Sequence, residues 1–216
     1  PPTRWPTAAA WALLKDPAVL ALVGSAGVMS LAVSVFYAFY PGYLEGVGID
    51  RKWVGLIVSI GVAVEIVCML GFGWVLHRVG VRGVMILGAA STAVRLALLA
   101  LVPGPGVAIA TQILHGPFVL SLYVAPQLYL NHKADDHFRN SVLGMYAMLI
   151  FGVARLAGGA AGGHVAEAVG GDRLLGLRSA LGFGAVAAAV AVGWLAIGFR
   201  DELACRGLRD AHPQGD

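Results

Sequence analysis

Charged side chains are scarce in this chain of 216 residues. Asp, Glu, Lys and Arg together make up 12% of it, which is about half of their share in a typical soluble domain. Hydrophobic residues make up 58%, and the mean hydropathy is +0.79. So few charges cannot cover the surface of a soluble protein, and soluble enzymes, nucleic-acid-binding proteins and disordered chains are largely excluded. The composition predicts a protein that crosses a membrane several times.

The residues that most enzymes and metal proteins need are also scarce. Cys68 and Cys205 lie in an apolar run and in a polar tail, so they predict neither a disulfide framework nor a metal site. His164 and Glu167 share a helical face, but two ligands do not form a metal site. The chain has no glycine-rich phosphate loop and no serine nucleophile motif. We therefore expect no enzymatic activity, no cofactor, no metal and, despite a net charge of +3, no nucleic-acid partner.

Long apolar runs are what the chain has instead. A helix needs about 20 apolar residues to cross a hydrocarbon core of about 30 Å, and six runs reach that length. Turn residues separate them, such as Pro41-Gly42 after the first run and Gly170-Gly171-Asp172 before the sixth. We expect an all-α membrane protein with a cytoplasmic linker at 1–16, a cytoplasmic tail at 201–216, and six spans at about 17–40, 53–76, 83–102, 107–130, 140–165 and 176–199.

The distribution of Lys and Arg predicts the orientation of these spans, because cytoplasmic loops carry an excess of positive charge. With the N-terminus inside, both termini are cytoplasmic, and nine basic residues lie inside against four outside. The inner set is Arg4, Lys15, Arg78, Arg82, Lys133, Arg139, Arg200, Arg206 and Arg209, and the outer set is Arg51, Lys52, Arg173 and Arg178. Residue 1 is a proline and no methionine precedes it, so we expect the chain to be part of a longer protein.

Helix breakers and small residues occur within the runs. Pro117 and Pro126 remove backbone donors from the fourth run and predict a kinked helix. Such a kink can open a solute cavity or serve packing alone. The glycine pairs at 158–159 and 162–163 give the fifth run small residues four apart, which predicts close approach to a neighbouring helix.

Glu65 is the only acidic residue deep within an apolar run. A charge at that depth costs at least about 2.5–3.5 kcal/mol, so Glu65 should face a cavity or a partner. The helical rise places Glu65 ~18 Å and Arg95 ~12 Å below the outer surface on adjacent antiparallel spans. We expect the two side chains to pair, because pairing lowers the cost of both charges. The pair could serve proton coupling, or it could only fix the register of two helices.

Two further ionisable residues fall in the same layer. His115 lies ~12 Å below the outer surface on the fourth run, and Arg155 lies in the outer half of the fifth. The layer could bind a polar solute, relay protons or do both, and Tyr37, Tyr40 and Tyr123 could line the same cavity. Each residue also has a simpler interpretation. A lone histidine can be a packed core residue, an arginine can extend to the headgroups, and tyrosines near helix ends often belong to the interfacial aromatic belt.

The segment between the second and third runs resembles a known loop signature. Residues 73–82 read Gly-Trp-Val-Leu-His-Arg-Val-Gly-Val-Arg and resemble the Gly-x-x-x-Asp-Arg-x-Gly-x-Arg/Lys loop of the major facilitator superfamily. The matching positions are Gly73, Arg78, Gly80 and Arg82, while His77 replaces the aspartate. In that superfamily the signature follows the second helix of each six-helix half. The resemblance implies one half of a 12-helix transporter, and the polar lead-in and basic tail favour the C-terminal half.

Within the superfamily, most of residues 15–165 is similar to the bacterial nucleoside:proton symporters. Those proteins carry a glutamate in the eighth helix and an arginine in the ninth, at the separation of Glu65 and Arg95. The stretch from Leu114-His115-Gly116 to Tyr129 also resembles their tenth helix. The resemblance implies that Glu65 is the proton-sensitive carboxylate and that Arg95 is its charge partner. His115, Arg155, Tyr37 and Tyr123 are the candidate solute ligands.

The resemblance implies a proton-coupled symporter for a small polar solute such as a nucleoside, located in the inner membrane and completed by an N-terminal six-helix half. Two positions depart from the nucleoside symporters: Val62 stands in place of a glutamine, and Val119-Leu120 in place of Phe-Asp. Phenylpropionate-type permeases share the glutamate, the arginine and the Leu-His pair, so an aromatic acid is the second candidate solute. Sugars, as in lactose-permease-like symporters, come third. Outside transporters, a six-helix channel or a membrane scaffold is the alternative.

Overall fold

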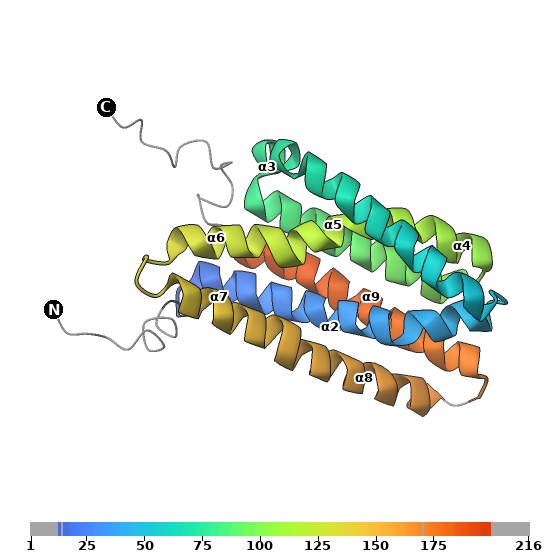
Figure 1. Ribbon diagram of the computed structural model, residues 1–216. Helices are drawn as coiled ribbons and strands as arrows, with labels where there is room; N and C mark the ends of the chain where they lie inside the picture. The colour runs from blue at the N-terminus through green and yellow to red at the C-terminus, as the bar shows by residue number, and fades with distance from the viewer. Residues whose placement is uncertain (1–12, 14, 170, 200–216) are drawn as a thin grey trace.

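The computed structural model describes residue 13, residues 15–169 and residues 171–199. The predicted tail at 201–216 and nearly all of the predicted linker at 1–16 lie outside these residues. The described part is a bundle of helices with no strand, and the long helices lie side by side along one direction (Figure 1). Its elements are α2 (Pro17–Gly46), α3 (Arg51–Leu101), α4 (Pro105–Ala110), η1 (Thr111–Leu114), α5 (Gly116–Val119), η2 (Leu120–Val124), α6 (Ala125–Lys133), α7 (Arg139–Ala147), η3 (Met148–Val153), α8 (Ala154–Val169) and α9 (Arg173–Gly198).

These elements form six membrane crossings. Four described helices are long and apolar enough to span a membrane: α2, α3, the run 139–169 and α9. The bent run 105–133 adds a fifth crossing when it is taken as one span. The sixth comes from α3, whose 51 residues would extend ~77 Å as one straight helix, more than twice the hydrocarbon thickness. α3 is instead divided at Gly80, where φ is 68° and ψ is 178°, and its two parts run in opposite directions (Figure 1).

A side-chain cap marks the start of the first span, α2, and tertiary packing determines where it ends. Asp16 caps α2, because its carboxylate accepts hydrogen bonds from two backbone N–H groups of the first turn, at 2.8 and 3.4 Å. The turn expected at Pro41-Gly42 is not formed, and α2 continues to Gly46. Tyr43 and Leu44 are fully buried in the core. Tertiary packing therefore holds the last turn of α2 in helix despite the proline.

The fourth span is bent by 41° between 105–114 and 116–133. Pro117 follows the bend directly and cannot donate a backbone hydrogen bond to the preceding turn. Pro126 follows the π-helical turn η2 and also lacks a backbone donor, about two and a half turns later. The predicted kink is confirmed, and it falls at His115, whose side chain belongs to the candidate site.

Glycines allow two of the helix contacts to be very close. A Cβ atom at Gly116 would lie 2.8 Å from the backbone oxygen of Val64, so the fourth span lies directly against the first half of α3. A Cβ atom at Gly158 would lie 2.8 Å from Cα of Leu31. The predicted close approach of the fifth span to a neighbour is confirmed, and the neighbour is α2.

Two arginines join the third and sixth spans at opposite ends of the bundle. Arg82, just after the break in α3, donates through Nε to Leu195 O at 3.2 Å and through Nη2 to Ala196 O at 2.5 Å. Arg178, near the start of α9, donates through Nε to Ala100 O at 2.8 Å. The last carbonyls of a helix lack partners within the helix. Each span therefore supplies donors to the C-terminal end of the other, which fixes their relative register.

Candidate functional site

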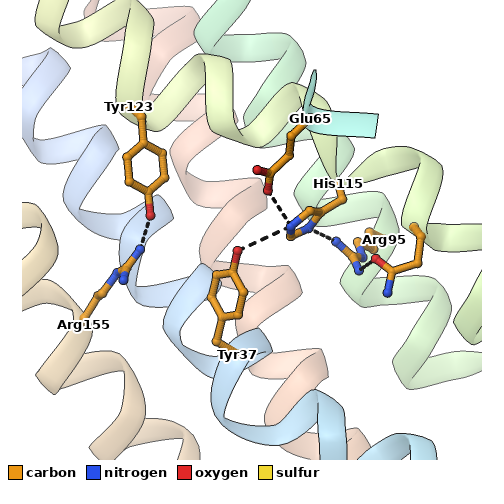
Figure 2. Close-up of polar contacts among 7 residues, drawn as sticks. Tyr37, Glu65, Arg95, His115, Tyr123 and Arg155 are labelled. Carbon is orange, nitrogen blue, oxygen red and sulfur yellow. Dashed lines mark hydrogen bonds and ion pairs between the residues drawn. The ribbon is translucent and has the colours of Figure 1, made fainter. Parts of the chain in front are cut away.

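Glu65 and Arg95 do not form the direct ion pair that the sequence predicts. Within the described residues no carboxylate oxygen of Glu65 lies within 4.0 Å of Arg95, and His115 stands between the two side chains. The Nε2 atom of His115 lies 2.8 Å from Glu65 Oε1, and its Nδ1 atom contacts Nη1 of Arg95 (Figure 2). Both charges contact the same imidazole, because the bend of the fourth span places the ring in the gap between them.

The contacts of His115 define its tautomer. A guanidinium can only donate hydrogen bonds, so Nδ1 of His115 must accept from Arg95 and carry no proton. The single ring proton of the neutral imidazole is then on Nε2, which donates it to the carboxylate of Glu65. The three side chains form an ordered chain from a fixed positive charge, through a neutral imidazole, to a titratable carboxylate. The second, third and fourth spans meet at these three side chains.

Arg95 is 3% exposed and is held on several sides. Its Nη2 atom donates to Gln112 Oε1 at 2.6 Å, and Gln112 Nε2 donates to the hydroxyl of Tyr40 at 2.9 Å. Tyr40 in turn donates to Ala108 O at 2.8 Å. The guanidinium carbon also lies 4.0 Å from the ring centre of Phe36, a cation–π contact that offsets part of the cost of burial.

One member of this network, Gln112, is absent from the predicted site, whereas Tyr40 is one of the tyrosines expected to line the cavity. Gln112 lies three residues before His115 and so occupies the same face of the fourth span, which is the signal that identifies it. Tyr40 lies three residues after Tyr37 on α2 in the same way. Both residues are buried, and both extend the network away from Glu65 into the core.

Tyr37 belongs to the accessible side of the site. Its side chain is 44% exposed, and its hydroxyl lies 3.4 Å from Nε2 of His115. Glu65, whose side chain is 20% exposed, reaches the same imidazole nitrogen. A solute or a proton that reaches this side therefore meets Tyr37 and Glu65 first, while His115 and Arg95 lie behind them.

The remaining predicted residues, Arg155 and Tyr123, form a second group. Nη2 of Arg155 donates to the hydroxyl of Tyr123, and Tyr37 lies between this pair and His115 (Figure 2). Tyr123 stacks on Phe151 with ring centres 4.8 Å apart and an interplanar angle of 12°. The guanidinium of Arg155 lies 5.9 Å from the first ring centre and 5.4 Å from the second. Arg155 therefore points inward to an aromatic pair and not toward the headgroups.

The loop motif lies away from these two groups. Gly80 supplies the break in α3, and Arg82 donates to the end of α9 as described above. The guanidinium of Arg78 packs over the ring of Trp74 at 4.6 Å, and Gly73 is exposed. Among the described residues, no group of three His, Cys, Asp or Glu side chains could hold a metal ion.

The described residues thus form a helical bundle with a buried chain of polar side chains. In structure, the chain resembles the crystal structure of the nucleoside transporter NupG (D323A mutant), with a TM-score of 0.75, 18% sequence identity, and coverage of 92% of this chain and 53% of that one. In sequence, residues 4–174 match the family described as "MFS_1 like family". The chain belongs to this family of the major facilitator superfamily.

One curated relative is the "Putative nucleoside transporter YegT" of Escherichia coli (strain K12). It is 26% identical to this chain over 164 residues, which cover 72% of this chain and 37% of the relative. The chain thus spans about half of the solved transporter and little more than a third of YegT. These proportions agree with a single six-helix half of a 12-helix fold.

Proposed function

We propose that this chain is the C-terminal half of a proton-coupled secondary transporter whose solute is of the nucleoside class. The observation that carries the proposal is the chain from Arg95 through His115 to Glu65. It places one titratable, partly exposed carboxylate at the centre of three spans. The names of NupG and YegT support a nucleoside as the solute. An N-terminal half would cover the open side of the site, in the inner membrane and with both termini cytoplasmic.

Proton coupling follows from the chemistry of Arg95, His115 and Glu65. When Glu65 is ionised, its negative charge accepts a hydrogen bond from an imidazole that is polarised by Arg95, and such charge-assisted bonds are about twice as strong as neutral ones. When Glu65 takes up a proton, the charge that balances Arg95 is lost and the contact weakens. The first half of α3, which carries Glu65, is then less tightly held to the third and fourth spans. Protonation thereby changes the relative stability of the inward- and outward-facing states.

The solute contacts in this chain differ from those implied by the nucleoside symporters. Val119 is 6% exposed and Leu120 is 5% exposed, so neither faces the accessible side of the site. Val62 is exposed but apolar. Hydrogen bonds to the solute from this half would come from Glu65, Tyr37, Tyr123 and Arg155, with the remaining contacts supplied by the other half.

The experiment uses the complete transporter, with both halves, reconstituted in vesicles. Glu65→Gln keeps the size and hydrogen-bonding capacity of the side chain but removes its titration. The variant should no longer accumulate labelled uridine when a pH gradient is imposed, while exchange of labelled for unlabelled uridine should persist. The matched control is Glu167→Gln, an exposed glutamate near the end of α8, which should behave as the wild type. Undiminished pH-driven accumulation by Glu65→Gln would contradict the coupling role.

A further inference from the structure

Arg155 carries a positive charge in the middle of the fifth span without an acidic partner among the described residues. It is residue 17 of the 31 in the run 139–169, and such a position is costly for a charge that lacks a counter-ion. Its Nη2 atom is used by Tyr123, its Nε atom is buried and unpaired, and its Nη1 atom has no hydrogen-bond acceptor in the described chain. The arginine therefore has unused donor capacity.

Tyr123 adds a second donor at the same place. Its hydroxyl oxygen accepts the hydrogen bond from Arg155, so the proton of the hydroxyl is free to be donated elsewhere. Among the described side chains, this group offers mainly donors, and its one acceptor atom, the phenolic oxygen, already accepts from Arg155. Such a group favours an oxygen acceptor on a ligand and disfavours an amino group, whose N–H bonds would face other N–H and O–H bonds.

The aromatic rings of Tyr123 and Phe151 lie beside these donors and favour a flat ligand. Tyr123 and Phe151 are stacked and half-buried, and base–aromatic stacking stabilises any nucleobase with little regard to its identity. Both rings come from π-helical turns, Tyr123 from η2 and Phe151 from η3. Such turns are rare and occur frequently at functional sites.

The backbone of the fifth span is held in place beside this group. Ser30 donates to Ile150 O at 2.6 Å, and Ser34 donates to Arg155 O at 2.7 Å. These two bonds tie η3 and the start of α8 to α2, which also carries Tyr37. The positions of Phe151 and Arg155 relative to Tyr37 are therefore fixed by hydrogen bonds as well as by packing.

We propose that Arg155 and Tyr123 bind the keto oxygen of a nucleobase that packs on the Tyr123–Phe151 pair, so that the transporter selects keto bases over amino bases. This inference rests on the proposed function, since it takes the solute to be a nucleoside. Uridine and inosine present an oxygen where cytidine and adenosine present an amino group. Tyr37 lies between this donor group and the Glu65 carboxylate, which is a hydrogen-bond acceptor (Figure 2). The site therefore offers donors at one end and an acceptor at the other, and this difference orients the solute.

The test measures how well unlabelled nucleosides compete with labelled uridine for uptake by the complete transporter in vesicles. The wild type should bind uridine and inosine at least about tenfold more tightly than cytidine and adenosine, which is the size of discrimination expected when donors in a site face an amino group. Tyr123→Phe keeps the ring and removes one donor, and Arg155→Gln introduces an acceptor. Both variants should reduce the keto preference to about threefold or less.

The control variant is Phe151→Leu, which removes stacking but leaves both donors. It should weaken the binding of all four nucleosides to a similar extent and leave their ratios unchanged. Equal competition by all four nucleosides in the wild type would overturn the inference while leaving the proposed function intact. A keto preference that survives in both Tyr123→Phe and Arg155→Gln would also overturn it. If the wild type takes up none of the four nucleosides, the proposed function fails and the inference fails with it.

Discussion

Nε2 of His115 lies 2.8 Å from the carboxylate of Glu65, and this contact joins the first half of α3 to the fourth span. The opposite nitrogen of the same ring contacts Arg95 in the second half of α3. One imidazole therefore connects three successive spans and mediates between two charges of opposite sign. Its position at the bend before Pro117 follows from the local sequence.

The first prediction concerns the coupling of Glu65 and Arg95 through His115. Arg95→Leu leaves the Glu65 charge uncompensated and should destabilise the protein by about 3–5 kcal/mol. The double variant Glu65→Leu/Arg95→Leu should be more stable than Arg95→Leu alone. Thermal unfolding of the detergent-solubilised complete transporter measures both. The stabilisation that Glu65→Leu gives to Arg95→Leu should be smaller when His115 is also changed to Leu. If the losses from the two single changes simply add, Glu65 and Arg95 are not coupled through His115.

The second prediction concerns the reciprocal contacts of Arg82 and Arg178. Each arginine donates to carbonyls at the C-terminal end of the span that carries the other arginine. Because hydrogen bonds from charged donors contribute roughly 1.5–3 kcal/mol, Arg82→Gln and Arg178→Gln should each lower the stability by about 1–2 kcal/mol. Arg51→Gln is the matched control, since the Arg51 side chain is 90% exposed and its ion pair with Glu45 is long, at 3.7 Å. A loss in the control as large as in the two variants would refute the capping role.

The third prediction concerns pH and the ion pair between Asp16 and Lys133. Nζ of Lys133 lies 2.9 Å from Asp16 Oδ2, and its hydrogen bond holds the pKa of the Asp16 carboxyl below its ordinary value. A carboxyl whose pKa is lowered in the folded state stabilises that state above its ordinary pKa, and this stabilisation is lost as the pH falls through the lowered value.

Asp16→Asn isolates this contribution, because asparagine caps a helix about as well as aspartate does. The wild type should be more stable than the variant by about 1 kcal/mol or less at neutral pH, since the pair is partly exposed. The difference should disappear as the pH falls below about 4. Unfolding midpoints measured in a pH series provide the test, and a difference that grows toward acid pH would contradict the assignment.

The fourth prediction concerns the close contact at Gly116. An added methyl group would meet the backbone oxygen of Val64 at 2.8 Å, and a backbone atom cannot move away easily. Gly116→Ala should therefore destabilise the protein by about 1–3 kcal/mol. Gly163→Ala is the control, because nothing lies within 4 Å of a Cβ atom at that position. Equal effects of the two substitutions on the unfolding midpoint would show that the fourth span is not as close to α3 as described.

Much of the fold is predictable from the sequence, because the length of an apolar run is set by the thickness of the membrane. The six runs correspond to the six crossings, and the prolines of the fourth run mark its bend. The continuation of α2 past Pro41-Gly42 is not predictable in this way. It depends on the burial of Tyr43 and Leu44 against other spans, which a local pattern does not contain.

The sequence predicts which residues of the candidate site fall in one layer, but not how each helix is turned about its own axis. Counting residues along each span brings Glu65, Arg95 and His115 to one layer, because the helical rise is constant. The order of the three side chains depends on how each helix is turned about its axis, which is why His115 lies between the other two. Gln112 and Phe151 escape prediction because neither is charged, so the rarity of ionisable groups in membrane spans does not single them out.

We propose above all that proton movement and solute movement share the Glu65 carboxylate. The most direct measurement follows the external pH of unbuffered vesicles that contain the complete transporter when a transported nucleoside is added without an imposed gradient. The wild type should make the external medium more alkaline as the nucleoside enters, because protons enter with it. Glu65→Gln should take up the nucleoside to equilibrium with no change in external pH. Alkalinisation by Glu65→Gln equal to that of the wild type would show that protons are coupled elsewhere.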